Sequence, residues 1–394
     1  MPTDRLAHQL LLPELEMIDV SAWSRSWTHY QVRSTAKTAL CPRCPTLSRS
    51  VYDRRLCTVK DAPVRDQIVF LKIEKRRFWC KPCQKPFTEY VPGIKKGSRT
   101  TERFKRQVLW ACENFVDLTR VQKAYRVSAG YVFKTLYTRL EEKLRMRQYP
   151  WPSTIGIDEH SFRRDKKLGR TEFATIIVDY PNRRVFELAQ GKATAEIQPQ
   201  LAHIEGRENV KNVILDLCDP FKNFAREQFP NAKIIADKFH VLRLITPALL
   251  KKRYEITGTR ADARARRLLT MSSQKLDHWD RQALWQYMEK YPELQELYRY
   301  KEILHRFYRT KGFNRASSAL TNITDRMAES LIPEIKTLRR TLMKWRVEIL
   351  AYFETGLTNG RTEGYNNLAK LVQKRAFGYK NFRNYRLRLL SCCA

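Results

Sequence analysis

The sequence predicts a multidomain α/β protein with four parts: a cysteine-containing β module, a three-helix segment, a mixed α/β core, and an all-helical stretch that interrupts this core. Three observations predict this organisation. Two Cys-x-x-Cys pairs lie among short β-like runs before residue 97. Strand-like and helix-like runs then alternate from residue 153 to about 244. Beyond that point the strand signal disappears for about 110 residues, in which glycine is nearly absent.

The composition indicates a folded and strongly basic chain. Of its 394 residues 43% are hydrophobic and 11% aromatic, which excludes a disordered basic tail. Lys and Arg exceed Asp and Glu by 75 − 41 = 34, which favours a polyanionic partner, most commonly nucleic acid, over a protein that is merely basic. We expect no membrane partner and a cytoplasmic location. No apolar run reaches the roughly 18 residues of a membrane span, and the first 20 residues lack the pattern of a secretory signal.

Residues 1–97 are the first predicted domain, a β module built around two cysteine pairs. Cys41 and Cys44 form one pair, Cys80 and Cys83 form the other, and 35 residues separate them. Each pair places two thiolates on one tight turn, and two such turns supply the four soft ligands of a structural Zn²⁺. We therefore expect a zinc ribbon. A redox pair and unlinked buried cysteines are the alternatives.

Residues 98–149 are the second predicted domain, a helix-turn-helix. Three runs of helical pattern follow one another with short joints, at 101–115, 118–126 and 128–146. Ser128 is a suitable N-cap for the third helix. That helix would offer four side chains to a DNA groove: Tyr131, Lys134, Thr135 and Thr138. A plain three-helix bundle is the alternative.

Further expected DNA contacts are basic residues in two other segments. Arg76 and Arg77 stand near the second cysteine pair, so we expect the zinc ribbon to contact DNA as well. In the C-terminal tail, basic residues interleave with aromatic ones, a composition that suits phosphate contacts and stacking. The tail residues that we expect to contact DNA are Lys374, Arg375 and Lys380.

Residues 150–245 are predicted to form the first part of an RNase H-like core. The order strand–strand–strand–helix–strand–helix–strand fits a mixed sheet covered by helices. The strands are expected at 154–157, 173–178, 184–188, 210–216 and 232–236, and the helices at 193–204 and 221–228.

Residues 246–355 are the predicted all-helical insertion, and residues 356–394 return to the core. An apolar stripe runs from Leu331 to Ile349 in steps of three and four, which predicts one helix packed in a core. A final helix carries Glu363 in its first turn.

Three acidic residues stand where such a core would bring them together. Asp158 follows the first strand, Asp216 ends the fourth, and Glu363 begins the last helix. An RNase H-like sheet places its first and fourth strands side by side, with a C-terminal helix beside them. Converging carboxylates are hard oxygen ligands that suit two Mg²⁺ or Mn²⁺ ions about 3.5–4 Å apart. The combination predicts phosphoryl transfer on DNA.

The fifth strand is followed by Asp237 and His240, and these two residues leave open which aspartate is the second acid of the three. Asp237 is either the true second acid or a group behind the metal ligands, and we favour the latter. His240 is expected to be structural or to face DNA, because no second His or Cys stands at ligand spacing. Glu159 should point to the opposite face of its strand from Asp158.

Four sequence blocks carry a resemblance to a known family. They are Gly-Ile-Asp-Glu-His-Ser-Phe at 156–162, Ile-Ala-Asp-Lys-Phe-His-Val at 235–241, Thr-Asn-Gly-Arg-Thr-Glu-Gly-Tyr-Asn-Asn at 358–367 and Lys-Arg-Ala-Phe-Gly-Tyr at 374–379. These blocks resemble the ISL3 family of DDE insertion-sequence transposases, and the resemblance spans nearly the whole chain. It implies that Asp158, Asp216 and Glu363 are the catalytic acids. Leu217 and Phe221 stand where the family commonly has Met or a similar residue and then an aromatic.

The resemblance also implies an activity and partners. It implies a transposase that binds double-stranded DNA, at terminal inverted repeats and in the target, and that cuts and joins strands with Mg²⁺ or Mn²⁺. Two element ends must be brought together, so we expect a homodimer or a higher oligomer on DNA. The expected location is the bacterial cytoplasm, at the nucleoid when bound to DNA. Two alternatives are a catalytically inactive DNA-binding regulator and an RNase H-like nuclease without strand transfer.

Overall fold

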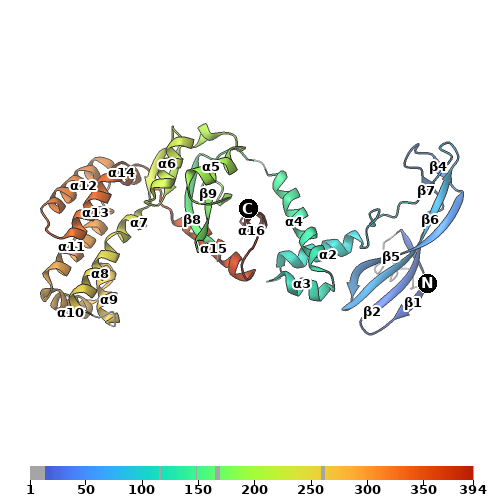
Figure 1. Cartoon of the computed structure of the whole chain (residues 1–394), viewed down its shortest axis with the longest axis horizontal. Coiled ribbons are helices and arrows are strands. Elements are labelled where there is room, and N and C mark those ends of the chain that lie inside the picture. The colour runs from blue at the N-terminus through green and yellow to red at the C-terminus, as the bar shows by residue number, and fades with distance from the viewer. Residues whose placement is uncertain (1–13, 115–116, 148, 165–168, 259–261, 394) are drawn as a thin grey trace. The chain divides into compact units, whose positions relative to one another are not determined.

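The computed structural model describes residues 14–114, 117–147, 149–164, 169–258 and 262–393. The chain divides into two compact units, Met1–Glu142 and Lys143–Ala394 (Figure 1). As predicted, it is a mixed α/β protein with a long helical region. Within the described residues, no helix combines the length and the apolar character that crossing a membrane requires.

The first unit begins with a five-stranded sheet and a two-stranded hairpin. The strands are β1 (Leu15–Trp23), β2 (Trp27–Ser34), β3 (Ala39–Leu40), β4 (Leu47–Ser48), β5 (Val51–Val64), β6 (Gln67–Cys80) and β7 (Lys85–Thr88). The sheet has the order β1-β2-β6-β5 with β7 paired to β6, while β3 and β4 form the hairpin. Alternate apolar residues of the strands, among them Val32, Leu71 and Ile73, bury a small core on one face of the sheet.

Three helices follow at the places where the sequence predicts them. They are α2 (Glu102–Asn114), α3 (Leu118–Tyr125) and α4 (Ala129–Arg145). Arg126 ends α3 in the left-handed region, with φ 46°. Ser128 caps α4 as expected, because its Oγ accepts a hydrogen bond from the Tyr131 main-chain N–H at 3.2 Å. Val121 and Leu136 are buried, so the helices pack through the apolar faces that predicted them.

The second unit contains a five-stranded mixed sheet. Its strands are β8 (Thr154–Arg164), β9 (Thr171–Asp179), β10 (Arg184–Gln190), β11 (Asn212–Leu215) and β12 (Lys233–Ala236), in the order β10-β9-β8-β11-β12. β9 runs antiparallel to both β8 and β10, and β11 runs parallel to both β8 and β12. All five predicted strands are present. β8 extends beyond the predicted end at 157 because its polar continuation still pairs with β9.

Helices cover both faces of this sheet, since alternate strand residues are apolar on each side. Ile157 and Leu215 pack toward α5 (Thr194–Leu201) and α6 (Asp219–Gln228) on one face. Ile214 and Ile235 belong to the core on the other face, which also takes in residues of α15 (Gly360–Arg375) and α16 (Phe382–Cys392). A short 3₁₀ turn, η1 (Arg207–Asn209), precedes β11.

The predicted helical insertion is helical in the structure. Its described helices are α8 (Ile245–Thr257), α9 (Ala263–Thr270), the 3₁₀ turn η2 (Ser273–Lys275), α10 (His278–Glu289), α11 (Pro292–Phe307), α12 (Phe313–Ala328), α13 (Pro333–Lys344) and α14 (Arg346–Thr355). A further helix, α7 (Lys238–Arg243), lies before the predicted start at 246. The prediction of one helix along the apolar stripe is wrong. Trp345 separates α13 from α14, and Pro333 starts α13, which leaves Leu331 outside the helix and exposed.

Candidate functional site

Three aspartates stand in one row at the ends of three neighbouring strands of the second unit, β8, β11 and the edge strand β12. The register of the parallel pairs matches Leu215 with both Ile157 and Ala236. The next residue along each strand is an aspartate: Asp158, Asp216 and Asp237. Strand side chains alternate between faces, and Leu215 and its two partners pack toward α5 and α6. The three aspartates therefore lie on the face covered by α15 and α16.

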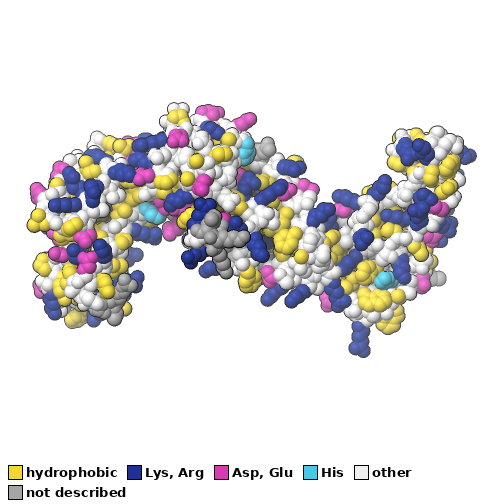
Figure 2. Space-filling model, viewed as in Figure 1, with side chains coloured by type: hydrophobic (Ala, Val, Ile, Leu, Met, Phe, Trp, Pro, Cys, Tyr) yellow, Lys and Arg dark blue, Asp and Glu magenta, His cyan; other side chains and the backbone are white. Residues whose placement is uncertain are grey.

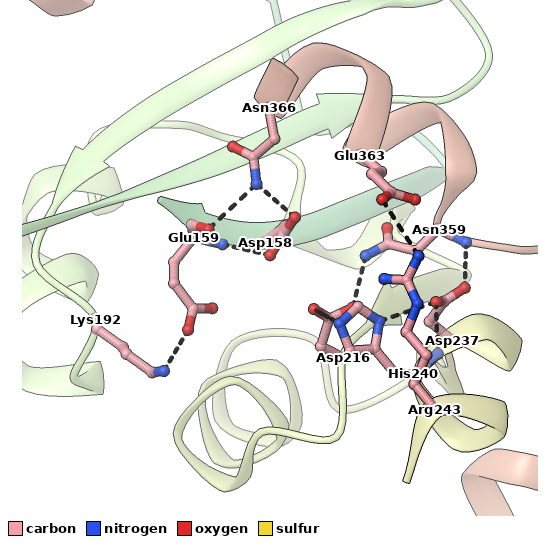
Figure 3. A network of polar contacts seen from close by, with 10 residues as sticks. All are labelled: Asp158, Glu159, Lys192, Asp216, Asp237, His240, Arg243, Asn359, Glu363 and Asn366. Atoms are coloured by element: carbon pink, nitrogen blue, oxygen red, sulfur yellow. Dashed lines mark hydrogen bonds and ion pairs between the residues drawn. The ribbon is translucent and has the colours of Figure 1, made fainter. Parts of the chain in front are cut away.

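The first turns of α15 reach over this row. Asn359, Glu363 and Asn366 have the spacing i, i+4, i+7 and so share one face of the helix. The Asn359 amide donates from Nδ2 to Asp216 Oδ1 at 3.0 Å. The Asn366 amide donates from Nδ2 to Asp158 Oδ2. Each amide thus holds one aspartate, and Glu363 lies between the two amides along the helix (Figure 3).

Gly156 allows α15 to lie this close to β8. A Cβ at this position would come within 2.1 Å of Thr362 Oγ1 and 2.6 Å of Tyr180 Cε2. Neither neighbour can easily give way, because the Tyr180 hydroxyl donates to the Thr358 carbonyl at 2.9 Å and lies 3.1 Å from Thr362 Oγ1. The glycine is therefore required by the close approach of helix and strand.

We expect Gly156→Ala to lower the free energy of unfolding by roughly 1–3 kcal/mol, the usual cost of overpacking a core. Urea unfolding of the full chain measures the change. Gly364→Ala on α15 is the matched control, because its Cβ would meet nothing within 4 Å. Equal losses in the two variants would show that steric crowding at Gly156 is not the cause.

The first two acids of the row interact electrostatically. Burial, together with the negative charge of Asp216, raises the pKa of Asp158 to about 7. A divalent cation between the two carboxylates would relieve this repulsion, and carboxylate oxygens are the ligands that Mg²⁺ and Mn²⁺ prefer. The chemistry of these carboxylates therefore suits the predicted metal ions. Among the described residues, however, neither Asp158 nor Glu363 belongs to a group of three or more ligand atoms within 4.8 Å of one another.

His240 lies between the second and third acids (Figure 3). Its Nε2 is 2.9 Å from Asp216 Oδ2, and its Nδ1 is 3.0 Å from Asp237 Oδ2. Hydrogen bonds with Asp216 and then Asp237 raise the pKa of His240 to about 10, so the imidazole is charged at neutral pH. With the imidazole deprotonated, Asp216, Asp237 and His240 would also offer ligand atoms within 4.8 Å of one another, a second arrangement that could hold a metal.

The carboxylate of Asp237 is fully engaged by the protein. Its Oδ1 accepts from the Asn359 main-chain N–H at 2.9 Å, and its Oδ2 accepts from the His240 main-chain N–H at 3.1 Å. Burial opposes ionisation of Asp237, but the hydrogen bonds from His240 and Asn359 outweigh it and hold its pKa below the ordinary value. These contacts cap α7 and fix the start of α15.

Glu363 is the most exposed of the predicted acids. Its side chain is 51% exposed, and its Oε1 lies 3.8 Å from Arg243 Nη2. Glu159 forms an ion pair with Lys192 and lies away from the acidic row, in keeping with the expected alternation along β8 (Figure 3). The structure therefore places Asp158 and Asp216 at the same level of two neighbouring strands and Glu363 on the helix that contacts both.

A buried polar network lies behind Asp158. Asn366 Oδ1 is 2.8 Å from His160 Nδ1, and His160 Nε2 is 2.7 Å from the Tyr385 hydroxyl. Burial lowers the pKa of His160 to about 4, so the ring is neutral. Sequence reasoning missed the roles of Asn359, Asn366 and His160. Asn359, Glu363 and Asn366 stand at positions i, i+4 and i+7. This spacing is the signal that could have indicated the two asparagines.

The four predicted zinc ligands form a cluster in the first unit. Cys41 and Cys44 lie on the β3–β4 turn, and Cys80 and Cys83 on the β6–β7 turn. The Sγ atoms of Cys44 and Cys80 are 3.3 Å apart, those of Cys41 and Cys83 are 4.0 Å apart, and all four fall within 4.8 Å of one another. Tetrahedral Zn²⁺ with Zn–S bonds of about 2.3 Å places its sulfurs about 3.8 Å apart. The cluster fits this ion.

The residues predicted to contact DNA differ in their exposure. Those on the surface are Lys134, Thr138, Lys374, Arg375 and Lys380. Thr135 is buried in the helical core, so its side chain does not reach the surface of α4. Tyr131 is half-buried, and its hydroxyl lies 3.1 Å from Thr100 Oγ1.

Arg76 and Arg77 are engaged within the sheet of the first unit. Arg76 Nη2 is 2.6 Å from Glu89 Oε2, and Arg77 Nε donates to Asp53 Oδ1 at 2.7 Å. Both guanidinium groups are mostly buried. Their observed contacts therefore tie β6 to its neighbours.

Proteins of similar sequence are transposases. A family model for ISL3-type DDE transposases, described as a transposase, matches residues 155–389. The transposase for insertion sequence element IS1001 of Bordetella parapertussis is 25% identical over 366 residues, which cover 89% of this chain and 87% of that protein. The transposase for insertion sequence element IS1557 of Mycobacterium tuberculosis is 26% identical over 347 residues, covering 79% of this chain and 76% of that protein. The matched segment includes the aspartate row and α15.

Proposed function

Since this chain belongs to the ISL3 family of transposases, we propose that it binds the terminal inverted repeats of an insertion sequence and catalyses metal-dependent DNA cleavage and strand transfer. The observation that supports the proposal is the position of Asp158 and Asp216 on neighbouring strands, each hydrogen-bonded by an asparagine of the segment that bears Glu363. These three acids are the proposed DDE triad. The family and its named relatives support the substrate, which is DNA.

The proposed catalytic domain is an RNase H-like core formed by residues 150–245 and 356–394, with the helical insertion at 246–355 between its parts. The strand order β10-β9-β8-β11-β12 supports this assignment, because three antiparallel strands are followed by two parallel ones. In this arrangement β8 and β11 are neighbours, so Asp158 and Asp216 follow paired residues on adjacent strands.

The chain's own residues organise the proposed reaction. Asp158, Asp216 and Glu363 would hold two Mg²⁺ or Mn²⁺ ions, which when bound activate the attacking hydroxyl and stabilise the leaving oxygen. Asn359 and Asn366 orient the first two carboxylates from one helix. Asp237 anchors that helix through the Asn359 N–H and orients His240 toward Asp216. We therefore assign Asp237 and His240 to positioning, with Asp216 as the second acid.

We assign recognition of the element ends to the zinc ribbon at 1–97 and the helix-turn-helix at 98–149. Lys134 and Thr138 on α4 are the proposed groove contacts, and Lys374, Arg375 and Lys380 the proposed phosphate contacts near the catalytic core. The exposure of these five side chains supports the assignment. The protein would act as a homodimer or a higher oligomer that holds two ends, at the nucleoid.

DNA binding should weaken steeply with salt. Lys and Arg side chains are spread over the visible surface of both units (Figure 2), and the net charge is +34. Each phosphate contact releases a condensed counterion, so log K should fall linearly with log salt concentration. Titration of labelled DNA between about 50 and 200 mM salt measures the slope. A flat plot would contradict binding through the phosphate backbone.

The test of the proposed function is incubation of the protein with labelled element ends and a target duplex, with Mg²⁺ or with EDTA. We expect cleavage at the element end, and joining of that end to the target, only with Mg²⁺. Binding without cleavage would favour an inactive DNA-binding regulator. Cleavage without joining would favour a nuclease.

A further inference from the structure

We propose that Tyr385, His160 and Asn366 form a relay of positioning residues that orients the Asp158 carboxylate for metal binding. The inference rests on the proposed function and deepens it. It connects the C-terminal helix α16 to the first acid of the proposed triad, over a separation of 225 residues between His160 and Tyr385.

The donors and acceptors of this relay can be assigned along its length. Asn366 Nδ2 donates to Asp158 Oδ2 and to the Glu159 carbonyl, the latter at 3.2 Å, so Asn366 Oδ1 is the acceptor end of the amide. His160 Nδ1, 2.8 Å from that oxygen, is then the donor, and Nε2 is paired with the Tyr385 hydroxyl at 2.7 Å. The Asn366 amide, held with its N–H toward Asp158, thus makes His160 Nδ1 the donor, and the Tyr385 hydroxyl holds the other end of the imidazole.

The relay is rigid because it is buried and packed. Asn366 and His160 are each 3% exposed and Tyr385 is 0% exposed. The Tyr385 ring stacks on Phe162, with centroids 5.5 Å apart. Turning either His160 or Asn366 around would leave buried polar atoms without partners, which is costly in such an environment. The Asp158 carboxylate is therefore held from behind in one orientation.

The two asparagines that contact the aspartates are held in place by different groups. Asn359 is the residue that precedes the helix, and its own main-chain N–H is fixed by Asp237. Asn366 lies two turns further along, and its side-chain oxygen is held by His160. Removing the relay should therefore loosen Asp158 while leaving the contact of Asn359 with Asp216 in place.

The experiment measures Mn²⁺ binding to the full chain by electron paramagnetic resonance of the free ion. Asp158→Ala defines binding at other sites. We expect Asn366→Leu to weaken binding at the acidic site by about 10- to 100-fold, the range for groups that orient metal ligands. Tyr385→Phe should weaken it less, because the ring stays packed and only the hydroxyl that pairs with His160 Nε2 is lost. Asn367→Leu, at the exposed neighbouring position, is the matched control and should bind Mn²⁺ as the wild type does.

Two substitutions of His160 separate positioning from a general structural role. His160→Asn places an amide N–H where Nδ1 lies and retains the link to Asn366. His160→Gln reaches the position of Nε2 and retains only the link to Tyr385. We expect His160→Asn to bind Mn²⁺ more tightly than His160→Gln. Equal Mn²⁺ affinities in the two variants would indicate a structural role and contradict the relay.

The outcomes distinguish the inference from the proposed function. Wild-type Mn²⁺ affinity in both Asn366→Leu and Tyr385→Phe overturns the relay, even if the protein transposes DNA. If the wild type binds Mn²⁺ through Asp158 and the variants lose it, but no DNA is cut, the proposed function fails and the relay stands. If the wild type binds no more Mn²⁺ than Asp158→Ala, both fail.

Discussion

Replacement of Asp158 or Asp216 by Asn is expected to abolish strand cleavage and to leave binding to the element ends intact. Asn keeps the shape of the side chain but removes the negative charge that attracts the metal. The loss should be at least about 10²- to 10³-fold, the cost of removing a single group that stabilises a transition state electrostatically. Gel assays of cleavage and of binding, on the same labelled ends, measure the two effects separately. Glu363→Gln should behave in the same way.

Two further aspartates serve as controls for this expectation. Asp237→Asn should retain measurable cleavage, because its carboxylate is taken up by the Asn359 and His240 N–H groups. Asp219→Asn should cleave as the wild type does, because Asp219 is exposed and pairs with Lys344 instead. Inactive Asp237→Asn together with active Asp216→Asn would make Asp237 the second acid. Undiminished cleavage by Glu363→Gln would contradict the two-metal mechanism.

Replacement of Cys41 by Ser is expected to release zinc and to unfold the turns that carry the cysteines. Zinc binding supplies about 10–16 kcal/mol in small zinc domains, so much of the local folding free energy should depend on it. The buried residues that pack around the cluster, Phe78 and Phe87, should then become accessible. Metal analysis of the full chain and limited proteolysis of its first unit measure the two effects.

Cys57→Ser is the matched control for the zinc prediction. Cys57 is half-buried on β5 and is outside the cluster of four thiols. The Cys57→Ser variant should retain one zinc ion per chain and resist proteolysis as the wild type does. Undiminished zinc in Cys41→Ser would contradict the assignment of the four ligands.

Much of the core and of the site was predictable because its signals are local. Each of the five strands of the second unit contains a short apolar run, and the acids Asp158 and Asp216 stand directly after two of these runs. The paired cysteines are likewise recognisable from their Cys-x-x-Cys spacing, and the structure brings all four together. These features depend on residues close in sequence.

The parts that escaped prediction depend on partners far apart in sequence. Asn366 contacts Asp158 across 208 residues, and an asparagine carries neither charge nor hydrophobic periodicity to indicate such a role. Thr135 lies on the buried side of α4, although its polarity favoured a groove-facing position. The apolar stripe that ends at Ile349 spans two helices, α13 and α14, which are separated at Trp345. The sequence did not indicate this break, because the buried residues of both helices recur with the same period.

Anomalous diffraction from crystals of the full chain grown with Mn²⁺ tests the central claim most directly. We expect anomalous peaks beside Asp158, Asp216 and Glu363, with Asp158 and Asp216 both contributing ligands. A peak held only by Asp216, Asp237 and His240, with none at Asp158, would contradict it.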